Sequence, residues 1–139
     1  MRVLTPRTAS IAASVCDAVV APADGLPAVA QTDTIASFDA TLAAGTGPAR
    51  VGLKALLLSL ELAPFALGER ARLRRLTRER RTAVIARLGR GPLAGALEGL
   101  TAVLAFSYFG DPGVSRGLGY DAAANAARGR ALREAEGRW

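Results

Sequence analysis

The stretch of sequence that decides the fold is Pro48-Ala-Arg-Val-Gly-Leu-Lys-Ala-Leu-Leu-Leu-Ser-Leu-Glu-Leu-Ala-Pro64. Proline is favoured in the first turn of a helix, so Pro48 is expected to open one. The residues that follow are apolar on nearly every side of a helix, which indicates a buried central helix. Pro64 is expected to bend or end this helix, because proline lacks the amide proton that the helix needs.

The composition of the 139-residue chain favours helices throughout. Half of the residues are hydrophobic, and only 5% are aromatic. Alanine and leucine, which are strong helix formers, supply most of the hydrophobic residues. A chain of this length can bury one sizeable core. We therefore expect an all-α fold, with a compact bundle of about five helices over residues 1–121 and a polar tail over residues 122–139 that is helical or disordered.

Local signals mark where the other helices begin and end. A hydroxyl or carboxylate cap, often beside a proline, is typical of a helix start. Such starts are expected at Thr5-Pro6, Thr77 and Asp111-Pro112, and further helices from about Asp33 to Ala44 and from Leu93 to Phe109.

The segment from Leu93 to Phe109 has two distinct sides when it is drawn as a helix. Its large residues share one stripe that should face the core, namely Leu93, Leu97, Leu100, Leu104 and Tyr108. Gly95, Gly99 and Ala102 lie on another side. Because the distance between packed helices depends on the side chains at the contact, these small residues predict a neighbouring helix that approaches closely.

The inventory of reactive side chains argues against catalysis by this chain. It has no histidine, which is the side chain best suited to proton transfer near neutral pH and the commonest metal ligand. Its single cysteine, Cys16, excludes a disulfide within the chain and a multi-thiolate zinc site. We therefore expect no catalytic, cofactor-binding or metal-binding residues. The alternative is an enzyme that uses Glu61 or Glu98, which lie in apolar helices where a raised pKa suits acid–base work.

The net charge of +6 is carried by arginine, with Lys54 as the single lysine. Seven arginines fall within twelve residues: Arg70, Arg72, Arg74, Arg75, Arg78, Arg80 and Arg81. They are interpreted as a solvated basic surface with Glu69 and Glu79 as partial counter-ions. The alternative function is a small basic helical protein that binds nucleic acid through phosphate contacts. Nucleic acid is the less favoured partner, because the region has neither a base-reading helix with Asn or Gln nor stacking aromatic residues.

No stretch of the sequence predicts a membrane span. The most apolar run, Ala55 to Leu67, reaches only about 20 Å as a helix, which is shorter than a bilayer core of about 30 Å. Residues Thr8 to Ala21 weakly resemble the apolar region of a signal peptide, but Asp17 interrupts the apolar run. A helix of the fold is therefore the better interpretation. The expected location is cytoplasmic, or periplasmic where a partner carries the export signal.

The segment Ser107-Tyr-Phe-Gly-Asp-Pro-Gly-Val-Ser-Arg-Gly-Leu-Gly-Tyr-Asp121 differs from the plain helical remainder of the chain. It combines an aromatic pair, a proline turn, a short helix and a Leu-Gly-Tyr ending. It strongly resembles the C-terminal signature of the gluconate 2-dehydrogenase subunit 3 family. Further similarity follows the family's order at Leu4-Thr-Pro-Arg7, Val15-Cys-Asp-Ala-Val-Val-Ala-Pro22, Asp24-Gly-Leu-Pro27 and Thr77-Arg-Glu-Arg-Arg81. Many separate subunits of that family carry a twin-arginine export signal; none is expected here, because the family-like residues begin at Leu4.

The resemblance implies a small non-catalytic subunit that accompanies an FAD-dependent oxidoreductase of the glucose–methanol–choline (GMC) group. The large partner would hold FAD and oxidise a hydroxyl group of a sugar, a steroid or another alcohol, while this chain binds no cofactor. Aromatic anchors on a turn make good interface hot spots. Partner contacts are therefore expected at Tyr108, Phe109, Pro112, Val114, Leu118 and Tyr120. A second interpretation is that Tyr108 and Tyr120 pack the core of the chain itself.

Overall fold

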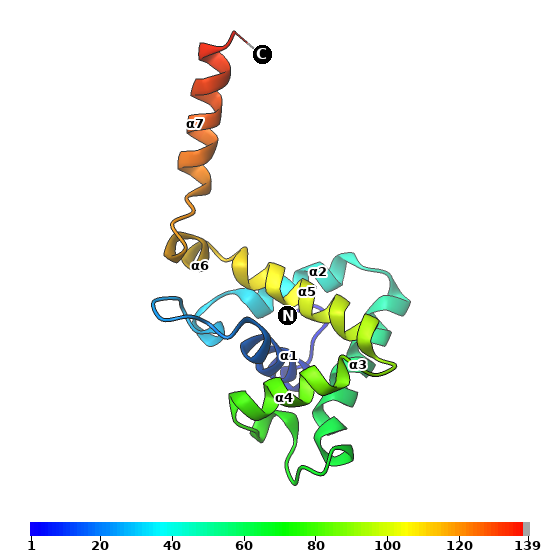
Figure 1. Cartoon of the computed structure of the whole chain (residues 1–139). Coiled ribbons are helices and arrows are strands. Elements are labelled where there is room, and N and C mark those ends of the chain that lie inside the picture. The colour runs from blue at the N-terminus through cyan, green and yellow to red at the C-terminus, as the bar shows by residue number, and fades with distance from the viewer. Residues whose placement is uncertain (138–139) are drawn as a thin grey trace.

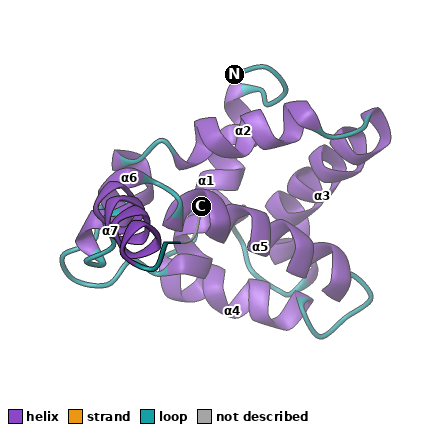
Figure 2. Ribbon diagram, turned by 90° about the horizontal axis from the view of Figure 1, so that it is seen from above, coloured by secondary structure: helices purple, strands orange, loops and turns teal. Residues whose placement is uncertain are grey.

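The computed structural model describes residues 1–137, and this part of the chain is helical without any strand (Figure 1). The all-α expectation is confirmed. The main helices form a bundle, and the last helix projects from it (Figures 1 and 2). The elements are α1 (Pro6–Val20), the 3-10 turn η1 (Val29–Gln31), α2 (Thr34–Ala44), α3 (Gly47–Ala66), the 3-10 turn η2 (Leu73–Arg75), α4 (Arg78–Leu88), α5 (Ala94–Phe109), α6 (Pro112–Gly117) and α7 (Ala122–Ala135).

Three of the helices begin at the caps that the sequence predicts. Thr5 and Thr8 form a reciprocal cap at the start of α1, in which the backbone amide of each residue donates to the hydroxyl of the other. The Thr77 hydroxyl accepts from the amide of Arg80, and the Asp111 carboxylate caps α6. These predictions succeed because a cap is a contact between residues only two or three positions apart.

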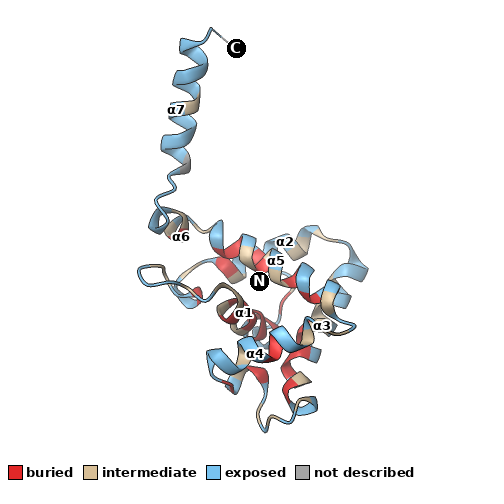
Figure 3. Cartoon of the chain, viewed as in Figure 1, coloured by how far each residue is buried: buried red, intermediate tan, exposed pale blue. Residues whose placement is uncertain are grey.

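The central helix of the bundle is α1, which packs against α2, α3, α4 and α5. Ile11, Ala12, Val15 and Cys16 are completely buried along it (Figure 3). Its alternation of small and branched residues leaves room for neighbouring helices on several sides. The first helix therefore occupies the place that the sequence predicts for the leucine-rich one.

The prediction that α3 is the buried central helix is wrong. Leu57, Leu60 and Glu61 are buried on its inner side, whereas Leu58 and Leu62 are 40% and 51% exposed on its outer side. The cause is that no other element of the described chain covers the outer side. Pro64 lies inside α3, and the helix ends at Ala66, within one turn of this proline.

Helix α5 buries the predicted stripe and exposes its opposite side. Leu97, Leu100, Leu104 and Tyr108 are buried, whereas Leu93 precedes the helix and is 40% exposed. The predicted close helix contact at the small residues is wrong, because a Cβ atom added at Gly95 or Gly99 would meet no atom within 4 Å. Helices α1 and α2 pack on the other side of α5.

The C-terminal tail forms α7, which extends away from the bundle (Figures 1 and 2). The Asp121 carboxylate caps this helix by accepting from the amide of Ala124 at 2.9 Å. The described residues of α7 are exposed apart from Gly129, which is half-buried, and Leu132 is 56% exposed. Of the two predicted alternatives for the tail, the structure has the helix. Among residues 1–137, no helix has the length and apolar character needed to cross a bilayer.

Candidate partner-docking surface

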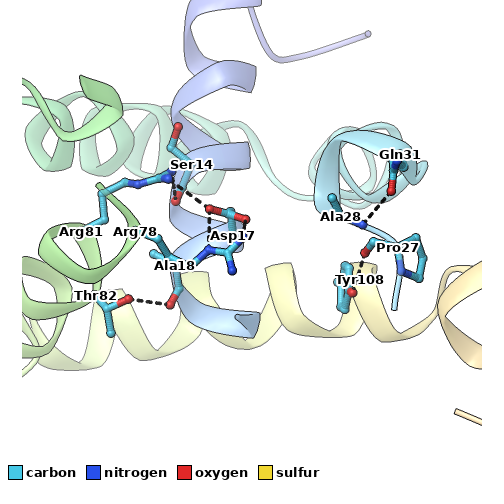
Figure 4. Close-up of polar contacts among 10 residues, drawn as sticks. All are labelled: Ser14, Asp17, Ala18, Pro27, Ala28, Gln31, Arg78, Arg81, Thr82 and Tyr108. Atoms are coloured by element: carbon cyan, nitrogen blue, oxygen red, sulfur yellow. Dashed lines mark hydrogen bonds and ion pairs between the residues drawn. The ribbon is translucent and has the colours of Figure 1, made fainter. Parts of the chain in front are cut away.

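The six residues predicted to contact a partner divide into two groups. Tyr108 and Val114 are completely buried in the core, so the expectation that they contact a partner is corrected. The Tyr108 hydroxyl donates to the carbonyl oxygen of Pro27 at 2.8 Å (Figure 4). Burial raises the pKa of Tyr108 above its ordinary value, so the hydroxyl stays protonated as a donor. The role of Tyr108 is to attach the end of α5 to the loop that follows α1.

The turn between α5 and α6 is held by Asp111. Its carboxylate accepts from the amides of Gly113 and Val114 at 2.8 and 3.4 Å, and from the amide of Asp33 at 3.0 Å. Burial alone would raise the pKa of Asp111, but the hydrogen bonds from Asp33, Gly113 and Val114 hold it below its usual value. One side chain thus caps α6 and ties it to the start of α2.

Helix α6 also packs against the loop after α1. A Cβ atom at Gly117 would lie only 2.9 Å from Cδ2 of Leu26, so glycine allows this close approach. On the other side of the turn, the Ser115 hydroxyl donates to the carbonyl oxygen of Phe109 at 2.8 Å. The backbone of this region is therefore fixed by contacts that leave its apolar side chains outside.

Four large apolar side chains remain exposed around this turn, and we name them the α5–α6 surface: Phe106 (80% exposed), Phe109 (46%), Leu118 (56%) and Tyr120 (56%). Phe109, Leu118 and Tyr120 are predicted contact residues, and Pro112 is exposed beside them. Phe106 is a residue that the sequence prediction missed. It lies beside a shallow depression of about 250 Å³ between α2 and α5, lined by Ser37, Thr41, Val103 and Ser107.

Comparison with known proteins gives no relative from which to transfer a function. No family model matches this chain, and no curated protein or solved structure matches it. The assignment of this surface therefore rests on its geometry and on the motifs in the sequence.

The arginine run is tied into the bundle by ion pairs. Nε of Arg74 lies 2.8 Å from Oε1 of the buried Glu61. Arg78 and Arg81 both pair with Asp17 on α1, at 2.8 and 3.1 Å (Figure 4). Four of the seven arginines, including Arg80, therefore pair with carboxylates of the same chain, and the pairs of Arg74, Arg78 and Arg81 connect separate elements of the bundle.

The counter-ions differ in part from those predicted. Glu69 does pair with an arginine, Arg80, at 3.1 Å. Asp17 is the counter-ion that the prediction missed, and its distance of more than 60 residues from its partners explains why local patterns did not reveal it. Arg70 and Arg72 make no ion pair within residues 1–137, and the same holds for Arg75.

The side chains considered for catalysis lie in different environments. Glu61 is buried against Arg74, and Glu98 is exposed on α5. Burial, with a smaller effect of Asp17, raises the pKa of Cys16 to about 12, so its thiol is protonated and unreactive at neutral pH. Within the described residues, no three His, Cys, Asp or Glu side chains come together as metal ligands would.

We expect Tyr108→Phe to lower the free energy of unfolding by about 1 kcal/mol, because the partly buried carbonyl of Pro27 loses its donor. Urea denaturation of the full chain measures this difference. Tyr120→Phe is the matched control, since Tyr120 is 56% exposed and its stability effect should be negligible. Equal effects of the two substitutions would contradict the role given to Tyr108.

Proposed function

We propose that this chain is a non-catalytic accessory subunit that binds a larger flavoprotein through the α5–α6 surface. The observation that carries the proposal is the exposure of Phe106, Phe109, Leu118 and Tyr120 around one turn whose backbone is held by hydrogen bonds. Full burial of an exposed side chain of this kind contributes about 1.5–3 kcal/mol, so these partly exposed side chains supply part of the binding energy of an interface.

The turn is suited to binding because it is already ordered. Tyr108 anchors its first end to the loop after α1, and Asp111 anchors its middle to α2. A surface that does not need to become ordered on binding avoids part of the entropic cost of association. The contacts beneath the surface therefore support a docking role for the side chains above it.

The nature of the partner follows from the motif resemblance. The segment from Ser107 to Asp121 resembles the signature of small subunits that accompany GMC-type dehydrogenases. In that arrangement the large subunit holds FAD and oxidises an alcohol, and the small subunit stabilises it or assists its maturation. The composition of this chain supports the same division of labour, because it supplies no histidine for proton abstraction.

The test is co-purification of the tagged full chain with a larger chain that carries flavin absorbance. We expect the double substitution Leu118→Ala and Tyr120→Ala to reduce recovery of the flavoprotein at least tenfold, because two anchors are lost. Leu132→Ala on α7 is the matched control, since Leu132 is also 56% exposed but lies outside the α5–α6 surface.

Two results would overturn the proposal. One is the absence of any flavin-carrying protein in the purified complex. The other is equal recovery of the flavoprotein with the double variant and with the wild-type chain.

A further inference from the structure

The outer side of α3 carries a continuous apolar row that nothing in the described chain covers. We name this row the α3 seam and define it as Val51 (69% exposed), Ala55 (exposed), Leu58 (40%), Leu62 (51%) and Phe65 (49%). The intervals between these residues are four, three, four and three. This is the spacing by which one helix packs along another in a coiled coil.

The seam has no charged residue, although 22% of the whole chain is charged. The positions that follow three of its members are Gly52, Ser59 and Ala66, all of them small and exposed. Small flanking residues allow a second helix to approach closely. A helix that is apolar on both sides is normally buried on both sides, and contiguous apolar patches mark interaction sites.

We propose that a second copy of this chain covers the α3 seam, and that the two α3 helices pair in antiparallel orientation. The side chains of the seam increase in size along the helix, from Val51 and Ala55 to Leu62 and Phe65. An antiparallel pair places the small end of each seam opposite the large end of the other. The volumes of the layers are then more even than in a parallel pair, which would place Ala55 opposite Ala55 and Phe65 opposite Phe65.

The distribution of charge selects the same orientation. Arg70, Arg72 and Arg75 follow the C-terminal end of α3 and have no ion pair within residues 1–137. A parallel pair would bring six such arginines together. An antiparallel pair separates the two sets by about 30 Å, the length of a 20-residue helix. That distance exceeds the screening length of about 8 Å at physiological ionic strength.

The expected dimer is symmetric and weak. The same surface is used on both copies, as in the commonest class of soluble oligomer. The area of one helix pair falls at the low end of specific interfaces, which predicts a dissociation constant on the order of micromolar.

The dimer leaves the α5–α6 surface available. Helix α3 lies on the opposite side of the molecule from α6 and α7, as two perpendicular views show (Figures 1 and 2). Self-association is therefore independent of the proposed function. It would place two copies of the small subunit in one complex.

The first test is sedimentation of the purified full chain from about 1 µM to about 300 µM, a range that brackets the expected affinity. We expect a monomer–dimer equilibrium that Leu62→Arg abolishes without loss of helical content, because Leu62 is half exposed in the single chain. Phe106→Arg is the matched control, since Phe106 is 80% exposed on α5, and it should leave the dimer intact.

The second test fixes the orientation with cysteines. In an antiparallel pair centred near Leu58, two Val51 positions lie about 21 Å apart, too far for a disulfide. Oxidation of Val51→Cys alone or Phe65→Cys alone should therefore give no cross-linked dimer. A mixture of the two variants should give one. The native Cys16 is completely buried and does not interfere.

Three outcomes would overturn the inference. A chain that stays monomeric throughout the range has no self-association, and another partner then covers the seam. A dimer that survives Leu62→Arg uses a different surface. Cross-linking of Phe65→Cys with itself would show a parallel pair. None of these results depends on whether a flavoprotein binds.

Discussion

Arg74→Met is expected to lower the free energy of unfolding by about 3 to 5 kcal/mol, the cost of leaving a buried charge without its partner. The Glu61 carboxylate is completely buried, and Nε of Arg74 lies 2.8 Å from it. The amide of Arg74 also donates to Glu61 at 3.4 Å. Because an amide carries no net charge, the guanidinium of Arg74 is the main source of compensating charge. Urea denaturation monitored by circular dichroism measures the change.

The double variant Glu61→Leu with Arg74→Met should recover most of the lost stability. Replacement of a buried ion pair by apolar residues of similar volume is often neutral, because the desolvation cost of both charges disappears. Arg80→Met is the matched control, since the side chain of Arg80 is 64% exposed in its pair with Glu69, and such pairs contribute at most about 1 kcal/mol. If Arg74→Met cost no more than Arg80→Met, the pair with Glu61 would not hold α3 to η2.

The importance of this pair shows where sequence reasoning succeeds and where it stops. The sequence places Glu61 in an apolar helix, where it is considered as an acid or base, and the structure pairs it with Arg74. The sequence does not identify Arg74 among seven nearby arginines, because that choice depends on how the segment after α3 turns back along it. Caps such as Thr5 and Asp111 are predicted correctly because their partners are adjacent in sequence.

The incorrect prediction that α3, rather than α1, is the central helix has a related cause. Hydrophobicity measures how much surface a helix can bury, but not whether another element is present to cover it. The leucines of α3 made it the expected centre, yet Leu58 and Leu62 face outward. If the proposed dimer forms, the buried environment indicated by the sequence is restored by a second copy rather than within one chain.

The 3.6-residue period of a helix separates the buried candidate contact residues from the exposed ones more accurately than the motif does. Tyr108 continues the buried stripe of Leu100 and Leu104, four residues beyond the latter, and this spacing already indicates a core position. Phe106 lies on the opposite side of the same helix, in line with Gly99 and Ala102, and the same argument predicts that it is exposed. The prediction from the motif included Phe109, as part of the aromatic pair, and omitted Phe106.

Asp39→Ala is expected to lower the free energy of unfolding by about 2 to 3 kcal/mol, since its carboxylate makes charge-assisted hydrogen bonds in a buried position. Asp39 is only 3% exposed on α2 and was not singled out by the sequence. Its oxygens accept from the amides of Arg2, Val3 and Leu4, at 3.0 Å for Val3 and 2.6 Å for Leu4. Loss of the carboxylate would release the segment that precedes α1 and leave the buried amide of Leu4 unsatisfied.

The effect of Asp39→Ala should depend on pH in one direction. Burial alone would raise the pKa of Asp39, but the hydrogen bonds from Arg2, Leu4 and Val3 hold it below the ordinary value of 3.8. A carboxylate whose pKa is lower in the folded state stabilises the fold above the unfolded-state pKa, and this contribution is lost as the pH falls through the folded-state pKa. Stability curves at a series of pH values should therefore show the two proteins converging below pH 3.8. Asp24→Ala, at an exposed position in the loop after α1, is the control and should match the wild type at every pH. A gap that stayed constant into strong acid would mean that Asp39 acts through packing rather than through its charge.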